Sequence, residues 1–240
     1  MISEAQKRQM RDAVAEIRAK MADAARAAGR DPKDVLLCAA CKTRTVEEVR
    51  YSAELPIDLF GENHVQELVE KTDAGAYLGK PGHFIGHLQT NKIKKVLGRA
   101  ALIQSVDSEH LLLALEAAAA KADVHQDILL EVNIGGEASK SGITPEGLFP
   151  LLETAALQPH LHVKGLMAIP PVNDNDTENR RHLAAMRALF EKAAALRDDR
   201  IAMNILSMGM SDDFENAILE GSTLVRIGTA IYGARDYSKK

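Results

Sequence analysis

Eight short apolar runs recur along the chain, each followed by a polar turn and a stretch with helical periodicity. The runs span residues 35–41, 57–61, 83–88, 101–106, 127–133, 163–169, 203–209 and 223–228. The helix-like stretches lie near residues 45–54, 62–74, 90–98, 108–121, 144–157, 176–197 and 211–220. Strands that alternate with helices pair in parallel. Eight such units in 240 residues predict an α/β fold, a closed (β/α)8 barrel of the TIM type.

An open, doubly wound sheet is the competing arrangement for this pattern. Sheets of that kind that bind dinucleotides carry a G-x-G-x-x-G motif after the first strand, and no such motif follows residues 35–41. No linker or break in composition divides the chain. Residues 1–240 are therefore predicted to form one domain.

The first thirty residues have a different pattern from the rest. Ser3 and Gln6 form a capping-box pair, and apolar residues then recur every three or four positions up to Gly29. We expect an N-terminal helix within residues 1–30 and a barrel over residues 35–237.

The charge balance limits the classes of partner. Thirty Lys and Arg residues against 34 Asp and Glu residues give a net charge of −4, which argues against a nucleic-acid-binding protein. No apolar run approaches the roughly 18 residues of a membrane span, and the N-terminus is polar from residue 3, so a cytoplasmic protein is expected.

Cys38 and Cys41 lie in an apolar run without a second cysteine pair, and they are predicted to be buried thiols rather than a redox or zinc site.

Lys42 follows the first predicted strand, at the barrel face where catalytic and binding residues gather. Alternate residues of a strand share a face, so the Lys42 ammonium is expected at the rim of an apolar interior, beyond Cys38 and Ala40. Burial favours the neutral amine, which attacks aldehydes to give a Schiff base. A rim lysine with its head group in water is the alternative.

Two turns have the composition of an anion-binding site. Residues 207–211 (SMGMS) and 228–230 (GTA) follow the seventh and eighth predicted strands, the usual phosphate position in this type of barrel. Ordinary turn chemistry is the alternative.

Arg226 lies inside the eighth run and needs a partner, either a carboxylate or a ligand atom. His83 and His87 are expected to share a face of the third strand, as structural histidines rather than a metal site.

These motifs resemble those of the YggS/PROSC group of pyridoxal phosphate homeostasis proteins, whose fold is similar to the barrel domain of alanine racemase. The similar segments are CKT (41–43), FGENHVQE (60–67), HFIGHLQTNK (83–92), VNIGGEASKSG (132–142), GLMAIPP (165–171), LSMGMSDDFENAI (206–218) and GSTLVRIGTAIYG (221–233). The resemblance covers roughly Val35 to Tyr237.

The resemblance implies pyridoxal 5'-phosphate as the cofactor and assigns residues to it. Lys42 matches the lysine that holds the cofactor aldehyde as a Schiff base, and Arg226 matches the arginine that faces the pyridine nitrogen. The other implied cofactor-binding residues are Ser207, Met208, Gly209, Gly228 and Thr229 in the two turns, and Asn63, His83 and Met167 along the site. Two residues depart from the family pattern: Cys41 where serine is frequent, and Gly82 where an aromatic residue is usual, which is expected to loosen one wall of the pocket.

The same resemblance implies a role in vitamin B6 homeostasis and amino-acid balance. Similar racemases take a proton-transfer group from a second domain, for which the chain beyond the eighth run leaves no room, and an arginine at the ring nitrogen weakens the cofactor as an electron sink. A monomeric carrier or regulator without robust catalysis is therefore expected, with apo forms of pyridoxal-phosphate enzymes as recipients. The alternatives are a single-domain amino-acid racemase that uses Lys42 as a base, and a Schiff-base aldolase acting on a sugar phosphate.

Overall fold

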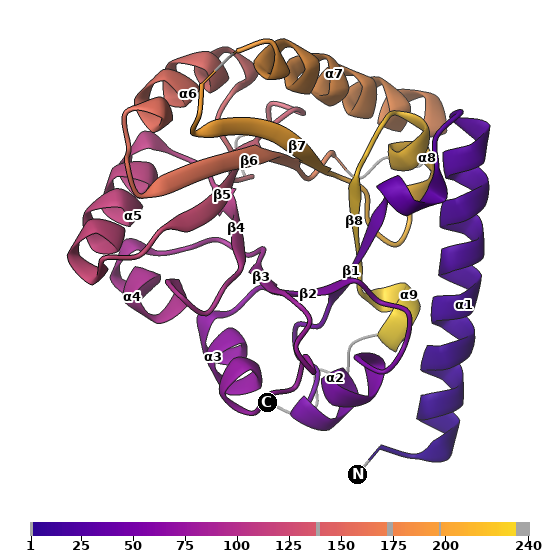
Figure 1. Cartoon of the computed structure of the whole chain (residues 1–240). Helices are drawn as coiled ribbons and strands as arrows, with labels where there is room; N and C mark the ends of the chain where they lie inside the picture. The colour runs from indigo at the N-terminus through magenta and orange to yellow at the C-terminus, as the bar shows by residue number, and fades with distance from the viewer. Residues whose placement is uncertain (1, 138–139, 172–174, 197, 234–240) are drawn as a thin grey trace.

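A closed barrel of eight parallel strands forms the centre of the computed structural model, which describes residues 2–137, 140–171, 175–196 and 198–233 (Figure 1). The strands are β1 (Leu36–Ala40), β2 (Leu59–Glu62), β3 (Gly82–Phe84), β4 (Leu102–Val106), β5 (Gln126–Val132), β6 (Leu161–Ala168), β7 (Ile201–Ser207) and β8 (Leu224–Ile227). They follow one another around the barrel in chain order, and β8 closes it by pairing with β1. The predicted fold class and all eight predicted strands are confirmed.

Helices surround the barrel on its outer face (Figure 1). They are α1 (Glu4–Ala27), α2 (Val46–Ser52), α3 (Val65–Asp73), α4 (Ile93–Val96), α5 (Glu109–Ala122), α6 (Leu148–Ala156), α7 (Asp176–Ala194), α8 (Phe214–Leu219) and α9 (Thr229–Tyr232), with short 3-10 turns at Pro32–Asp34, Thr90–Lys92 and Pro145–Gly147. The predicted stretch 90–98 is thus divided between a 3-10 turn and a single α-helical turn. The predicted ends at residues 197 and 237 lie outside the described residues, as do residues 138–139 of the family segment 132–142.

The N-terminal helix α1 lies outside the ring of helices and packs against α8 and α9 (Figure 1). The predicted capping box is present, because Ser3 accepts from the backbone of Gln6 and the Gln6 side chain accepts from the backbone of Ser3. One face of α1, including Met10, Val14 and Ile17, is buried in a cluster with residues of β1 and β8. This burial fixes α1 to the barrel at the place where the barrel closes.

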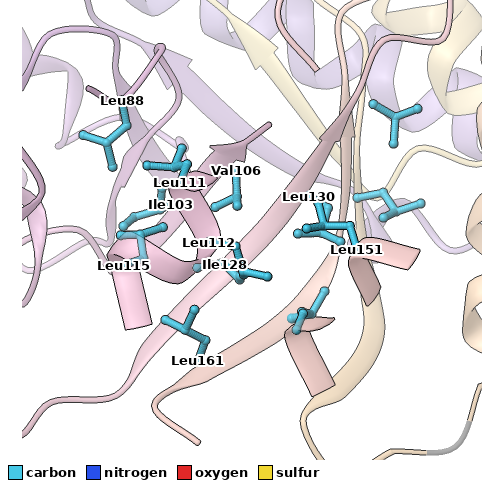
Figure 2. Close-up of a cluster of buried hydrophobic side chains, with 14 of the residues drawn as sticks. Leu88, Ile103, Val106, Leu111, Leu112, Leu115, Ile128, Leu130, Leu151 and Leu161 are labelled. Atoms are coloured by element: carbon cyan, nitrogen blue, oxygen red, sulfur yellow. The ribbon is translucent and has the colours of Figure 1, made fainter. Parts of the chain in front are cut away.

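The main hydrophobic core lies between β4, β5 and β6 and the helices outside them. Figure 2 shows part of it, in which leucines of α5, such as Leu112, meet Ile103 of β4 and Ile128 of β5. These three side chains are fully buried, and burying each contributes roughly 1.5–3 kcal/mol. The branched, apolar residues of the predicted runs therefore provide both the strands and the contacts that hold the helices.

The third strand is shorter than predicted, and His83 and His87 do not share a strand face. β3 ends at Phe84, and two residues later Gly86 lies so close to the backbone of Asn63 that a Cβ at Gly86 would lie 2.1 Å from the Asn63 carbonyl oxygen. His87 lies beyond this point, exposed and 3.2 Å from Asp107, whereas His83 is buried. The described residues hold no group of three or more His, Cys, Asp or Glu side chains arranged to bind a metal ion.

The structure places Gly82 against the ring of Tyr77, and the expected loosening of the pocket wall stays a prediction. A Cβ at Gly82 would lie 2.8 Å from the ring of Tyr77, which stacks on Phe60 with 5.2 Å between ring centroids. Position 82 thus faces Tyr77, and a side chain there would require the Tyr77 ring to shift. Cys38 and Cys41 are free and buried, as predicted, and burial raises the pKa of Cys38 to about 12. Among the described residues, no helix combines the length and apolarity of a membrane span.

Candidate functional site

A cavity of about 200 Å³ opens at the carboxyl ends of β1, β7 and β8. Its wall consists of Ala40, Lys42 and Arg44 from the β1 side, Met210, Ser211 and Asp212 from the turn after β7, and Arg226, Gly228 and Thr229 from β8 and its turn. Lys42 and Ala40 share the wall, as the alternation of side chains along a strand predicts. Three basic side chains and one carboxylate give the wall a positive balance, which favours an anionic ligand.

The turns after β7 and β8 meet at this cavity. The Arg226 N–H donates to the carbonyl of Gly209 at 2.9 Å, and the Ala230 N–H donates to the Ser211 hydroxyl at 3.3 Å. Gly209 has a φ of +94° and packs so close to Ala217 that a side chain at Gly209 would collide there. The predicted proximity of the two turns is therefore present, with Gly228, Thr229 and Ser211 on the wall.

Arg226 is the buried cation of the site, with only 4% of its surface exposed. Its guanidinium donates to the Ser207 hydroxyl and, at 2.9 Å, to the carbonyl oxygen of Ala168. Burial lowers the pKa of Arg226 from its ordinary value, but a guanidinium keeps its charge in proteins. No carboxylate in the described part of the chain forms a salt bridge with Arg226, although Glu131 and Asp213 attract its charge from a longer distance. Arg226 is also one of the residues that line the cavity.

A chain of hydrogen bonds runs from Arg226 across the barrel interior. The Ser207 hydroxyl accepts from Arg226 and donates to Gln104 Oε1 at 2.7 Å, and Gln104 Nε2 lies 2.9 Å from His83 Nδ1. Burial lowers the pKa of His83 to about 4, so its ring is neutral near pH 7. His83 Nδ1 then accepts from Gln104, and the proton of the ring lies on Nε2. Each hydrogen bond in this series is donated in the same direction, from β8 through β7 and β4 to β3.

Gln104 is a residue that sequence reasoning missed. It lies inside the apolar run 101–106, fully buried, and links two residues that the family resemblance had singled out. A polar residue within an apolar run was the available signal, the same signal that marked Arg226. Ser207 and His83 lie in the barrel interior rather than on the cavity wall.

The other predicted cofactor residues also lie away from the wall of this cavity. Met167 is buried against Leu102 and Leu129, and Met208 belongs to the core outside the barrel. Asn63 follows β2, and its buried Oδ1 has no hydrogen-bond partner within the described part of the chain. An unsatisfied buried acceptor costs about 1–3 kcal/mol, which a polar ligand atom would offset. Contacts of Asn63, His83, Met167, Ser207, Met208 and Gly209 with a cofactor remain predictions.

Arg44, on the wall of the cavity, is a second residue of the site that the sequence did not single out. Its Nη2 donates to the carbonyl of Gly233 at 2.7 Å, and its guanidinium carbon lies 5.4 Å from the centre of the Tyr232 ring. Glu48 lies 3.9 Å from Nη1. These contacts hold a second cation on the β1 side of the cavity, two residues after Lys42.

The barrel and its cavity define the class to which the protein belongs. The profile of the family described as "Alanine racemase, N-terminal domain" matches residues 13–236. Among solved structures, the alanine racemase of Corynebacterium glutamicum has a TM-score of 0.69 at 18% identity, over 95% of this chain and 62% of the racemase. At that identity the likeness shows a shared fold. The protein is thus a barrel of the alanine racemase N-terminal class.

Within that class, the chain belongs to the family of pyridoxal phosphate homeostasis proteins. The protein of that name from Aquifex aeolicus is 42% identical over 88% of this chain and 91% of its own, and the one from Pseudomonas aeruginosa is 41% identical over 93% and 95%. PipY of Synechococcus elongatus, solved with pyridoxal phosphate bound, has a TM-score of 0.80 at 27% identity, over 94% of this chain and all of PipY. A crystal structure from Bifidobacterium adolescentis, described only as an unknown protein, has a TM-score of 0.90 at 34% identity, over 97% of this chain and 98% of that protein.

Proposed function

We propose that this protein binds pyridoxal 5'-phosphate in the cavity at the ends of β1, β7 and β8, and that it serves vitamin B6 homeostasis and amino-acid balance. One observation supports this proposal most strongly: a single small cavity joins Lys42, the buried charge of Arg226, and the hydroxyl-bearing turns after β7 and β8. These three features suit three groups of one ligand. Lys42 suits an aldehyde, Arg226 suits a basic ring nitrogen, and the two turns suit a phosphate.

The residues present fit this cofactor group by group. The Lys42 amine would form a C=N bond with the aldehyde carbon, and the aldehyde oxygen would leave as water. Ser211, Gly228 and Thr229 offer hydroxyl and backbone groups to the phosphate, beside the cations on the wall. Arg226, which forms no salt bridge with a carboxylate among the described residues, would face the ring nitrogen. Asn63 Oδ1, a buried acceptor without a hydrogen-bond partner among the described residues, lies beyond this wall, and a cofactor that reached it would donate a hydrogen bond to it.

A carrier or regulator suits these residues better than a catalyst. When bound, the cofactor supplies an electron sink, which depends on a protonated ring nitrogen. The guanidinium of Arg226 disfavours that proton because both groups would be positive. A racemase also needs proton-transfer groups on both faces of its substrate, and the described cavity wall offers Lys42 and the carboxylate of Asp212 for that purpose. Racemisation by this pair remains the alternative function.

An absorption spectrum of the purified protein tests the proposal. The Schiff base is expected to give a band in the near ultraviolet or visible that borohydride removes. A protein that shows no such band after addition of pyridoxal phosphate and removal of the unbound cofactor contradicts the proposal and favours an aldolase. A coupled assay with single enantiomers of amino acids then distinguishes a carrier from a racemase. The proposal also includes release of the cofactor to apo-enzymes, which transfer assays test. It further includes a monomeric state, which light scattering tests, and a cytoplasmic location, which cell fractionation tests.

A further inference from the structure

The turn that carries Lys42 has an unfavourable backbone. The Arg44 N–H donates to the carbonyl of Cys41 at 3.1 Å, which closes a four-residue turn, and Thr43 at its third position has a φ of +64°. A positive φ at this position of a turn is usually adopted by glycine. For a β-branched residue such as threonine it is strained. The turn therefore needs support from outside, since its own residues do not favour it.

Two side chains of α3 provide this support, one on each side of Lys42. The Thr43 N–H lies 3.1 Å from each of the two Glu67 carboxylate oxygens. The Lys71 ammonium donates to the carbonyl of Cys41 at 2.7 Å. The peptide groups before and after Lys42 are thus both bound by charged groups from one helix. Hydrogen bonds to charged groups are stronger than neutral ones.

Lys71 is itself held in a buried polar cluster under the turn. Its ammonium is 1% exposed and lies 2.8 Å from Glu62 Oε1 and 3.7 Å from Glu67 Oε2. Glu62 Oε1 also accepts from the Cys41 thiol at 2.8 Å and from the Tyr77 hydroxyl at 3.2 Å. Burying an ion pair gains little stability over an apolar core of the same volume. The buried cluster around Lys71 is therefore explained better as a means of orienting the turn that carries Lys42 than as a source of stability for the fold.

We propose that Glu67 and Lys71 are positioning residues for Lys42. They hold the strained turn from outside the barrel wall, and thereby fix the backbone from which the Lys42 side chain enters the cavity. Neither residue lines the cavity. The inference rests on the proposed role of Lys42 as the amine that condenses with the cofactor aldehyde. It goes beyond that role by assigning the orientation of the amine to two residues of α3.

Glu67 provides the first test, because its side chain is partly exposed and its replacement leaves no buried charge without a partner. In Glu67→Ala, the Schiff-base band is expected to form about tenfold more slowly after pyridoxal phosphate is mixed with the apo-protein. Binding of pyridoxine 5'-phosphate, which has no aldehyde, is expected to be unchanged. Glu67→Gln keeps one acceptor for the Thr43 N–H, and its rate of band formation is expected to lie between those of the wild type and Glu67→Ala. Glu70→Ala, at an exposed position of the same helix, is the matched control.

The second test separates positioning from a general structural role. Thr43→Gly removes the strain, because glycine adopts positive φ readily. Added to Glu67→Ala, it is expected to restore the rate of band formation. A slow double variant would show that Glu67 acts by docking α3, and would overturn the inference. A Glu67→Ala variant as fast as the wild type would overturn it too, while leaving the proposed function intact. A wild-type protein that forms no band refutes the proposed function itself, and the inference falls with it.

Discussion

Arg226 is the residue whose surroundings most restrict the ligand. In Arg226→Gln we expect a change in the absorption maximum of the bound cofactor and little change in its retention. The amide can still donate to Ser207, and the variant leaves no carboxylate without its salt-bridge partner. Spectra and dissociation constants of the two proteins measure both quantities. Unfolding of the variant would instead assign Arg226 a structural role, through its buried hydrogen bonds to the Ser207 hydroxyl and the Ala168 carbonyl.

Glu131 is a buried acid of the barrel, 5% exposed, whose pKa burial raises to about 7. Asp107 raises this pKa further and Arg226 opposes the shift. The folded state therefore holds the proton more tightly than the unfolded state, and stability falls as the pH rises from about 4.5 to 7. Relative to wild type, Glu131→Gln is expected to gain about 2–3 kcal/mol in unfolding free energy between pH 5 and pH 8. Urea denaturation at the two pH values measures the gain, and an equal difference at both would contradict it.

His83 acts in the opposite direction. Because burial lowers its pKa to about 4, the unfolded state binds the proton more tightly, and stability falls as the pH drops from about 6.5 to 4. His83→Gln keeps an acceptor for Gln104 and is expected to be less sensitive to acid than the wild type over that range. The contributions of His83 and Glu131 partly cancel in the wild-type profile, so single variants are needed to see either. An unchanged acid limb in His83→Gln would show that the ring titrates at its ordinary pKa.

At the scale of elements, β4 contains two neighbouring polar residues with different surroundings. Gln104 bonds to Ser207 and His83, whereas the buried Ser105 hydroxyl has no partner among the described residues. Gln104→Met leaves two buried groups unsatisfied and is expected to cost about 2–4 kcal/mol. Ser105→Ala, the control from the same strand, is expected to be neutral or stabilising. Chemical denaturation measures both, and equal costs would show that the hydrogen-bond chain adds nothing to stability.

The turns after β7 and β8 form the second test at this scale. If they hold a phosphate, pyridoxal is expected to bind the apo-protein at least 100-fold more weakly than pyridoxal phosphate, since each charge-assisted bond contributes about 1.5–3 kcal/mol. Comparing ligands is better than replacing Gly228, because a Cβ there would lie 2.9 Å from the Ala40 carbonyl oxygen and disturb β1 as well. Similar dissociation constants would mean that the turns are purely structural.

For the whole molecule, the sequence predicts the barrel well because the barrel repeats one local pattern eight times. Each apolar run became a strand, and the C-terminal ends of the strands placed Lys42, Arg226, Gly228 and Thr229 around one cavity. What the sequence did not predict depends on contacts between distant segments. Gly86 lies against the backbone of Asn63 just after β3, and Tyr77 lies beside Gly82. No local pattern contains either pair.

The support of Lys42 was also not predictable from the sequence, for the same reason. Glu67 and Lys71 read as ordinary charged positions of an amphipathic helix, and only the packing of α3 against the barrel brings them to residues 41 and 43. The strained φ of Thr43 has no sequence signal, because glycine is the residue usually found at such a position.

The most direct test of the central claim is to locate the attached cofactor. The protein is saturated with pyridoxal phosphate, reduced with borohydride, digested, and analysed by mass spectrometry. The pyridoxyl group is expected on Lys42, in the cavity beside Arg226. Lys140, which pairs with Glu137, and Lys164, which lies 3.7 Å from Asp127, are the internal comparisons, and neither lines the cavity. Stoichiometric label on either of them, with Lys42 unmodified, would contradict the proposed site.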